Sequence, residues 1–365
     1  MSVFDTKKNK SICVLPWVHE YKTISGKTGP CCYARQLQGN ETMEQVRQEM
    51  LDGVQPRVCK TCYIKEEGSG YSPRINETIS WLKKFGEPAT DSPSIQFIDI
   101  RYDPTCNLKC KMCGPESSTL WQKERKVKFI ANEDNKKYLH SVNKKDLKKV
   151  YLAGGEPTYI KDYLVFLQEL NAVNPDCEVI INTNLKKLSV EWKEIFKKFK
   201  NLTVVCSCDA IDKLGVYVRY PLGWDDFEEN VKWVSENVNF LQFNLVAMNI
   251  TSHKLFETCT WMKKYSNNIN LSILEGPEYF LERAVPLDQR HVYIKNIEKL
   301  VKFPVSVHYA MNFRTKIQYL LKKYSTDNFD ENLHSALRQE IDAQDQHRTL
   351  QLDDVDQFLH QWIYR

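Results

Sequence analysis

Short apolar runs alternate with amphipathic runs through the middle of the chain. The apolar runs are rich in Val, Ile, Leu and Tyr and are mostly closed by Gly, Asn, Asp or Pro, which is typical of β-strands. We expect strands at 95–102, 149–153, 178–183, 202–208, 241–249 and 269–274. The runs between them place apolar residues at helical spacing. They predict helices at about 116–128, 159–171, 190–199, 225–237 and 253–265.

This alternation predicts an α/β fold. Strands and helices that alternate at this spacing give parallel strands joined by right-handed crossovers. Six such units predict a partial (β/α)6 barrel, similar to a TIM barrel but short of its eight units. In such folds the chemistry gathers at the C-terminal ends of the strands. Asp225 and Glu228 have the spacing of a capping box at the start of the fourth helix.

The two ends of the chain differ from this middle part. Residues 1–93 carry cysteines and turn signals, with short helices expected at 42–52 and 77–85. Residues 278–365 predict a mostly helical C-terminal extension, with helices near 287–302, 311–324, 329–343 and 352–363 and one more strand at 304–309. We therefore expect three domains: a small cysteine-rich domain at 1–93, the barrel at 94–277 and the helical region at 278–365.

Composition narrows the class of protein. The chain has 365 residues, 42% of them hydrophobic, which allows a sizeable core. The net charge of +4 is too balanced to favour a nucleic-acid partner. We find no secretory signal and no run of about 20 apolar residues, so we expect a cytoplasmic protein without a membrane partner. A reducing cytosol keeps thiols free, so the 12 cysteines are candidates for metal binding or chemistry.

Three cysteines follow the first barrel strand and its Asp103–Pro104 turn. Cys106, Cys110 and Cys113 have the spacing C-x3-C-x2-C. Thiolates are the usual ligands of iron–sulfur clusters. A four-iron cluster needs four ligands, so this loop would leave one iron open for reactivity. The alternatives are free thiols and zinc, but a structural zinc site usually takes four protein ligands.

The loop and its position after the first strand resemble the signature of the radical S-adenosylmethionine superfamily. The resemblance implies that a 4Fe-4S cluster binds the three cysteines as the catalytic centre. It also implies that the methionine amino and carboxylate groups of S-adenosyl-L-methionine chelate the open iron. The reduced cluster then cleaves this cofactor to a 5′-deoxyadenosyl radical, which abstracts hydrogen from a substrate. Met112 fills the family's apolar position before the third cysteine and would face the adenine.

Further motifs fit the same family. Gly154, Gly155 and Glu156 follow the second strand and resemble the motif that receives the methionine amino group. An ordinary strand–helix turn is the alternative, since paired glycines also permit unusual torsions. Asn182 and Asn184, on one face at the end of the third strand, resemble the polar strand end near the ribose and methionine moiety, or are turn-forming asparagines.

The fourth strand and the segment after it add two candidates. Ser207 matches the family's strand-four hydroxyl near the cofactor, whereas we expect Cys206 and Cys208 to pack in the core. Arg219 resembles the basic residue that many members place against the methionine carboxylate, because its planar fork gives two parallel hydrogen bonds. A surface salt bridge is the alternative for Arg219. Asp99 and Arg101 share a face of the first barrel strand and would either meet substrate or form a structural ion pair.

Five more cysteines precede residue 63. Cys59 and Cys62 form a C-x2-C pair, a strong metal-ligand spacing. Cys13, Gly26 and Cys31 are spaced as in the first half of the auxiliary-cluster motif of SPASM and twitch domains, although most such domains follow the barrel. The resemblance implies a second, auxiliary 4Fe-4S cluster on Cys13, Cys31, Cys59 and Cys62. Cys32 could replace Cys31, and a zinc site with four cysteines remains an alternative. His19 reads as a packing histidine.

Taken together, these motifs predict a radical S-adenosylmethionine enzyme of the oxidoreductase or maturase type. The resemblance implies a peptide or protein side chain as substrate, modified by oxidation or cross-linking, with the auxiliary cluster accepting an electron or shaping the pocket. It also implies an external electron donor such as flavodoxin or ferredoxin. A nucleotide or small metabolite is an alternative substrate, and a non-catalytic iron–sulfur or zinc protein is an alternative function.

Overall fold

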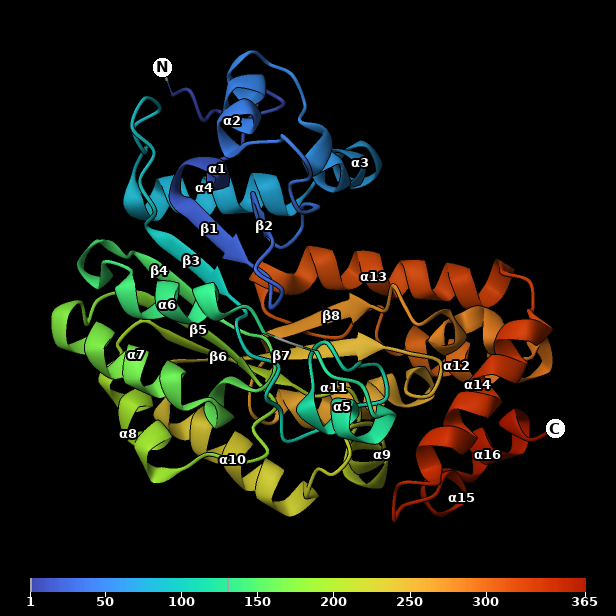
Figure 1. The fold of residues 1–365 in the computed structure, drawn as a ribbon. Coiled ribbons are helices and arrows are strands. Elements are labelled where there is room, and N and C mark those ends of the chain that lie inside the picture. Colours follow the sequence, from blue (N-terminus) through green and yellow to red (C-terminus); the bar gives the residue numbers. More distant parts are fainter. Residues whose placement is uncertain (1, 130) are drawn as a thin grey trace. The chain divides into compact units, whose positions relative to one another are not determined.

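The computed structural model describes residues 2–129 and 131–365, which form an α/β fold with a mostly parallel sheet (Figure 1). The strand order is β2-β1-β3-β4-β5-β6-β7-β8. The strand bounds are β1 (His19–Lys22), β2 (Thr28–Gly29), β3 (Phe97–Ile100), β4 (Lys149–Leu152), β5 (Glu178–Thr183), β6 (Leu202–Ser207), β7 (Phe240–Ala247) and β8 (Ile269–Ile273). The six predicted barrel strands are β3 to β8, and the predicted partial (β/α)6 barrel is confirmed.

The chain divides into two compact units. The first comprises Met1–Pro104, Phe129–Ile181 and Lys198–Asn201, and the second comprises Thr105–Lys128, Asn182–Lys197 and Leu202–Arg365. The three-domain division expected from the sequence stays a prediction. Among the described residues, no helix combines the length and the apolar character that crossing a membrane requires.

In the first unit, the cysteine-rich segment contributes two strands, β1 and β2, to the sheet. β1 pairs in parallel with β3, so that Tyr21 lies beside Asp99, and β3 pairs in the same sense with β4, so that Asp99 lies beside Tyr151. The sequence did not predict β1, because His19–Lys22 lacks an apolar run and is stabilised by its partner strand. The helices here are α1 (Leu15–Val18), α2 (Met43–Leu51), α3 (Lys60–Ser69), α4 (Pro73–Phe85), α6 (Glu133–Ser141) and α7 (Lys161–Val173).

Local signals explain the helix boundaries of the first unit. Thr42 and Gln45 form a capping box at the start of α2. Ser72 caps α4, and Pro73 follows at the first helical position, where its missing N–H is not needed. α4 therefore begins four residues earlier than the helix expected at 77–85. The apolar faces of these helices bury Trp17, Met50 and Trp81 in one core cluster.

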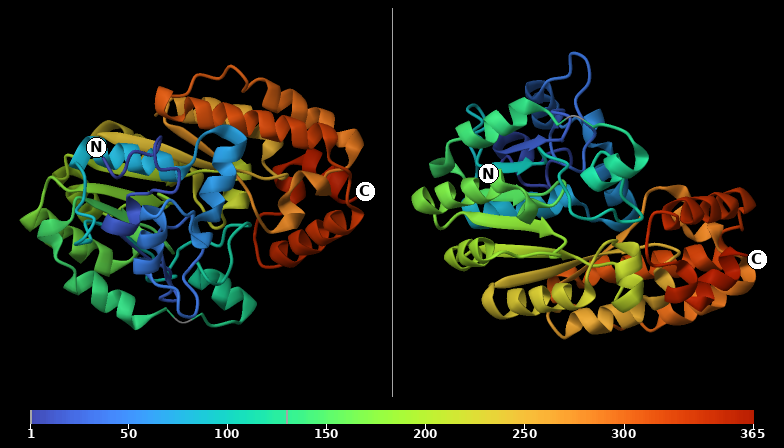
Figure 2. Two further views of the ribbon diagram at one scale, coloured as in Figure 1. Left: turned by 90° about the horizontal axis from the view of Figure 1, so that it is seen from above. Right: turned by 60° about the horizontal axis from the view of Figure 1, so that its bottom comes forward.

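In the second unit, β6, β7 and β8 are parallel neighbours. The helices assigned to it are α5 (Thr119–Arg125), α9 (Asp212–Val218), α10 (Trp224–Asn237), α11 (Leu255–Lys263), α12 (Arg290–Glu298), α13 (Val307–Thr326), α14 (Glu331–Asp345), α15 (Leu352–Val355) and α16 (Gln357–Ile363). α8 (Val190–Lys198) lies almost wholly in this unit. The C-terminal helices, orange to red, gather together in both views of Figure 2.

Two local predictions in the second unit were wrong. No strand forms at 304–309: Ser306 is the N-cap of α13, whose apolar face packs beside β8, and the segment has no strand partner. The capping box at Asp225 and Glu228 does not form either, because α10 begins earlier, after Gly223. The Glu228 carboxylate instead accepts hydrogen bonds from Trp261 Nε1 at 2.7 Å and from the Tyr265 hydroxyl at 2.9 Å.

Candidate functional site

The cysteine loop lies between β3 and α5 and is fixed by backbone hydrogen bonds. The Lys109 N–H donates to the Tyr220 carbonyl at 2.7 Å, and the Lys111 N–H donates to the Val218 carbonyl at 2.8 Å. These two bonds pair the loop with the last residue of α9 and the segment that follows it, without any regular secondary structure in the loop itself. A loop that satisfies its backbone groups in this way can hold a defined shape.

Helix α5 supports the loop from its N-terminal end. Ser118 Oγ donates to the Leu108 carbonyl at 2.6 Å and also accepts the Trp121 N–H at 3.3 Å, so one buried hydroxyl caps the helix and holds the loop. Trp121 Nε1 donates to the Cys110 carbonyl at 2.9 Å. The backbone around Cys110 is therefore anchored from the helix side.

The three thiols of the loop differ in exposure. Cys110 is buried, Cys106 is half-buried and Cys113 is exposed. Arg219 Nη1 donates to Cys110 Sγ at 3.7 Å, and Asn184 Nδ2 donates to Cys106 Sγ at 3.9 Å. Two thiols of the triad therefore accept hydrogen bonds from neighbouring side chains, and Cys113 is the most exposed residue of the three.

This donor set fits an iron–sulfur cluster. Cluster ligands must be thiolates, and burial raises the pKa of Cys110 above its ordinary value. The Arg219 guanidinium acts in the opposite direction, because its positive charge favours the thiolate. Hydrogen bonds to cluster sulfurs are also a means by which proteins tune such centres. Met112, between the second and third cysteines, is half-buried.

Arg219 belongs to a buried ion pair. Its Nε donates to Asp209 Oδ2 at 2.8 Å, with the Asp209 side chain fully buried, and Asp209 Oδ1 accepts the Val246 N–H at 3.0 Å. The sequence suggested a surface salt bridge as the alternative role, but the pair is internal. Asp209 thus orients Arg219 toward the cysteine loop, a role that the sequence analysis did not assign.

The two asparagines at the end of β5 have different neighbours. Asn182 Oδ1 accepts a hydrogen bond from Ser207 Oγ at 3.3 Å, so the ends of β5 and β6 meet there. Asn184 lies beyond the last strand residue, and its Nδ2 donates to Asn107 Oδ1 at 2.9 Å. The structure therefore brings Asn184 to the cysteine loop and Asn182 to Ser207.

The glycine motif follows β4 in the first unit. Gly154 and Gly155 both have positive φ, at 82° and 35°. A Cβ on Gly154 would lie 2.9 Å from the Arg101 Cβ, so the close approach requires glycine. Glu156 is almost fully buried, and one of its carboxylate oxygens accepts hydrogen bonds from the Thr158 N–H at 2.9 Å and hydroxyl at 2.6 Å. The carboxylate is therefore oriented by its own turn.

Asp99 of β3 forms an ion pair with Arg101, the residue that follows the strand. Arg101 Nε lies 3.4 Å from Asp99 Oδ1, and the guanidinium lies over the Tyr21 ring, 5.4 Å from its centre. Asp99 is buried, whereas about a third of the Arg101 side chain is exposed. Of the two predicted roles, the structural ion pair is present.

Four N-terminal cysteines line one small apolar cavity in the first unit. Cys13, Cys31, Cys59 and Cys62 are all buried, and Arg74, Tyr33 and three prolines also line the cavity. Burial raises the pKa of Cys13 to about 12, and the nearby Cys62 thiol adds to the effect. Among the described residues, no three His, Cys, Asp or Glu side chains converge closely enough for a single metal ion. A cluster differs in its requirement, because each thiolate binds its own iron.

Cys31 and Cys32 have different surroundings. Cys31 is buried in the cavity and interacts electrostatically with Cys13 and Cys59. Cys32 is exposed and interacts instead with Asp99 and Arg101. The fit of the four cavity cysteines to an auxiliary cluster therefore includes Cys31 and leaves Cys32 outside.

The sequence analysis missed contacts that join distant segments. Lys111, inside the cysteine loop, pairs with Asp345 at 3.0 Å, and the two residues are separated by 234 positions. No periodicity or motif signals a pair at such a distance. For Asp209 a signal existed, because it lies two residues after Ser207, the last residue of the fourth barrel strand, and the alternation of side chains along an extended chain predicts the same face for both.

Known proteins with similar sequences include proteins named GTP 3′,8-cyclase. The GTP 3′,8-cyclase of Nautilia profundicola is 29% identical over 113 residues, which cover 30% of this chain and 35% of that protein. The probable GTP 3′,8-cyclase of Pyrococcus abyssi is 25% identical over 203 residues, covering 54% of this chain and 60% of that protein. The chain thus spans less than two thirds of either relative.

Similar solved structures are more distant. Streptococcus suis SuiB has a TM-score of 0.41 at 16% identity, covering 74% of this chain and 65% of that one. Native anSMEcpe with bound AdoMet has a TM-score of 0.39 at 15% identity, covering 56% of this chain and 59% of that one.

A family match spans residues 102–262, which contain the cysteine loop and β4 to β7, and its description is "Radical SAM superfamily". Residues 102–262 of this chain are therefore similar to the Radical SAM superfamily.

Proposed function

We propose that the chain is a radical S-adenosylmethionine enzyme whose Cys106, Cys110 and Cys113 hold a catalytic 4Fe-4S cluster. When bound, this cluster and S-adenosyl-L-methionine together supply a 5′-deoxyadenosyl radical, which abstracts hydrogen from the substrate. The observation that carries the proposal is the triad itself. It offers three thiols on one loop for a cluster of four irons, so one iron would lack a protein ligand. Two of the three thiols accept hydrogen bonds from Asn184 and Arg219.

The other motif residues would then bind and orient the cofactor. Glu156 would accept hydrogen bonds from the methionine amino group, because Thr158 already fixes one of its oxygens. Gly154 and Gly155 would let the backbone approach the methionine moiety. Met112 would pack against the adenine.

A second group of residues would bind the carboxylate and the ribose of the cofactor. Arg219, held by Asp209, would keep a positive charge beside Cys110 and the cofactor carboxylate. Ser207 and Asn182 would offer a hydroxyl and an amide to the cofactor's polar groups, and Asn184 would donate to the sulfur of Cys106.

The proposal includes an auxiliary 4Fe-4S cluster on Cys13, Cys31, Cys59 and Cys62. Their shared cavity supports this assignment, and four thiolates would close the site so that it binds no cofactor. Such a cluster would accept an electron from a substrate radical or shape the substrate pocket. The catalytic cluster would receive its electron from an external donor such as flavodoxin or ferredoxin.

We propose a peptide or protein side chain as substrate, with oxidation or cross-linking as the outcome. A nucleotide is the second candidate, favoured by the similarity to proteins named GTP 3′,8-cyclase. An assay of 5′-deoxyadenosine formation distinguishes the two candidate substrates. If GTP is the substrate, adding it to the reduced enzyme increases 5′-deoxyadenosine formation, whereas an unchanged rate argues against the nucleotide.

The main test is anaerobic reconstitution with iron and sulfide, followed by reduction in the presence of S-adenosylmethionine. We expect about eight irons per chain and release of 5′-deoxyadenosine. Cys113→Ala should abolish the release, whereas Cys259→Ala, a buried cysteine of the same unit, should keep it. A loop without iron, or a cofactor that stays intact, would refute the proposal.

A matched pair of cysteine variants tests the auxiliary site. Cys31→Ser should lose about four irons, whereas Cys32→Ser should keep about eight, because only Cys31 lines the cavity. Four irons with one zinc in the unmodified protein would leave the catalytic cluster in place and exclude the auxiliary one.

A further inference from the structure

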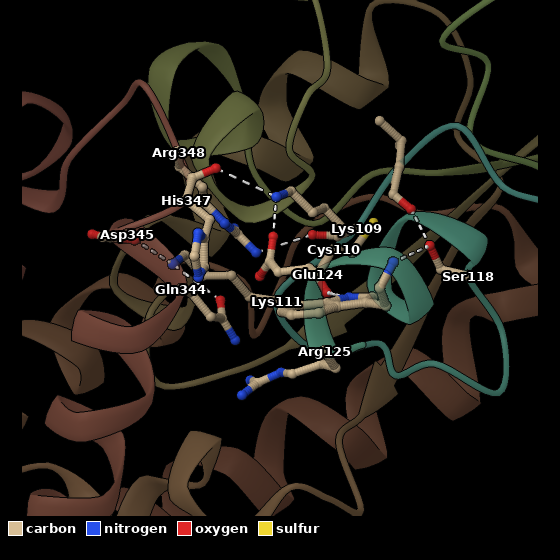
Figure 3. Close-up of polar contacts among 12 residues, drawn as sticks. Lys109, Cys110, Lys111, Ser118, Glu124, Arg125, Gln344, Asp345, His347 and Arg348 are labelled. Carbon is tan, nitrogen blue, oxygen red and sulfur yellow. Dashed lines mark hydrogen bonds and ion pairs between the residues drawn. The ribbon is translucent and has the colours of Figure 1, made fainter. Parts of the chain in front are cut away.

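A buried lysine lies inside the cysteine loop. Lys111 stands between Cys110 and Cys113 in the sequence, and its side chain is completely buried. Burying an ammonium group is costly unless its charge and its donors are satisfied. The contacts of Lys111 therefore show which part of the molecule the loop is bound to (Figure 3).

The partners of Lys111 come from the end of α14. Its Nζ donates to Asp345 Oδ1 at 3.0 Å and to Gln344 Oε1 at 3.2 Å. The same ammonium lies 3.8 Å from the centre of the Tyr217 ring, and the Tyr217 hydroxyl donates to Asp345 Oδ2 at 2.9 Å. Both carboxylate oxygens of Asp345 thus accept a hydrogen bond, one from Lys111 and one from Tyr217.

A second contact reaches the loop from the same segment. Arg348 Nη2 donates to the Lys109 carbonyl at 3.1 Å, and Nη1 donates to the Tyr217 carbonyl at 3.3 Å. The guanidinium lies 5.5 Å from the ring centres of Trp121 and Tyr220. Residues 109–111 are therefore held at two points by one C-terminal segment (Figure 3).

That segment is itself tied down. Gln351 Nε2 donates to the carbonyls of Asp345 and Arg348, at 2.9 Å and 3.1 Å. Gln344 Nε2 donates to Glu340 Oε1 at 2.7 Å, and Glu340 forms an ion pair with Arg125 of α5. The residues that receive Lys111 are thus themselves held by hydrogen bonds, which is what a positioning element requires.

We propose that Gln344, Asp345 and Arg348 form a brace that positions the cysteine loop for cluster binding. The brace rests on the proposed function, because it assumes that the flanking cysteines are cluster ligands. Anchoring Lys111 fixes the backbone from which Cys110 and Cys113 project. The brace residues position the loop and are not catalytic. We assign this buried ion pair to positioning the loop, because buried ion pairs contribute little net stability compared with apolar residues of similar size.

The test compares two ion-paired carboxylates of the second unit. Asp345→Asn removes the charge opposite Lys111, and Asp356→Asn removes the charge opposite His253, 2.8 Å away and outside the cysteine loop. Hydrogen exchange of the loop amides is measured in the cluster-free full-length protein. Asp345→Asn should speed exchange at residues 109 and 111 by about tenfold, whereas Asp356→Asn should leave it unchanged.

The second readout is the reconstituted holoprotein. We expect Asp345→Asn to lose loop iron and to change the electron paramagnetic resonance signal of the reduced cluster, whereas Asp345→Glu restores both in part. Gln344→Ala, a milder change at the same ammonium, should shift exchange in the same direction if Asp345→Asn does not fold. Equal exchange at the loop in Asp345→Asn and Asp356→Asn overturns the brace. Loop iron missing already from the unmodified protein refutes the proposed function instead.

Discussion

Gly154 adopts a backbone conformation that a side chain would oppose in two ways. Its φ of 82° lies in the left-handed region, and a Cβ would lie 3.1 Å from the Arg101 Cα, a backbone atom that cannot move aside. Gly39 has a similar φ of 58°, but a Cβ added there would meet nothing within 4 Å. Alanine substitutions at the two glycines therefore distinguish the cost of backbone strain from the cost of crowding.

We expect Gly39→Ala to lower the free energy of unfolding by about 1 kcal/mol, the cost of a left-handed residue with a side chain. Gly154→Ala should lower it by at least about 2 kcal/mol, because crowding adds to the strain. Urea denaturation of both variants measures the difference. Equal losses would mean that the approach to Arg101 relaxes without cost.

His19 gives the first unit a sensitivity to acid. It is buried on β1, where its Nδ1 contacts the Pro30 carbonyl at 3.1 Å and its ring packs against Phe97. Burial lowers the pKa of His19 from 6.5 to about 4, despite the opposing charge of Asp99. The neutral ring is therefore the form that the fold accommodates.

Because the pKa of His19 is lower in the folded state, the unfolded chain binds the proton first as the pH falls. The free energy of unfolding should decrease by about 1.4 kcal/mol per pH unit between about pH 6.5 and 4, and the contribution is fully present above 6.5. His19→Gln should remove this part of the slope. Denaturation at pH 7.5 and 5.5 tests it, and parallel losses in both proteins would contradict the assignment.

At the scale of elements, α5 links secondary structure to the candidate site. Its cap, Ser118, both accepts the Trp121 N–H and donates to the loop carbonyl of Leu108. The cap of α2, Thr42, has a similar capping role at an exposed helix end. Folding of the helix and shaping of the loop are therefore coupled through one hydroxyl.

We expect Thr42→Ala to lower the free energy of unfolding by about 1 kcal/mol, the usual cost of a lost cap. Ser118→Ala should cost about 2 kcal/mol, because it also leaves the buried Leu108 carbonyl without this donor. The loss should be accompanied by faster hydrogen exchange in the cysteine loop. A Ser118→Ala protein with wild-type exchange there would show that the loop is held elsewhere.

At the scale of the whole molecule, the register of the sheet decides which side chains reach the core. Phe243 of β7 is fully buried and meets the Trp261 ring at 5.8 Å between centres, whereas Phe240 at the start of the same strand is 40% exposed. The core around Trp261 also includes Trp224 and Phe227. A slip of one residue would exchange the two faces of β7.

Phe243→Ala should therefore lower the free energy of unfolding by about 3–5 kcal/mol, because it leaves a cavity in the core. Phe240→Ala should change it by less than about 1 kcal/mol, since the side chain is already partly in water. Thermal and chemical denaturation measure both. Similar losses in the two variants would show that the register of β7 differs from the one described.

Much of the fold follows from local patterns in the sequence. The barrel strands are signalled by short β-branched runs, and α7 by Tyr163, Phe166, Leu167 and Leu170 at helical spacing. These signals act within a few residues, so the chain carries them before it folds. Where the pattern was ambiguous, tertiary partners decided: β1 forms because β3 pairs with it, and 304–309 joins no sheet because α13 begins at Val307 and packs against β8 as a helix.

For the candidate site, the sequence by itself determined which cysteines belong to one loop and which form the C-x2-C pair, because ligand spacing is local. Only the tertiary structure decided that Cys31 and not Cys32 faces the cavity, that Asp209 holds Arg219, and that Asp345 receives Lys111. Each of these depends on side chains that come from different elements, whose distances are set by packing and leave no periodic trace along the chain.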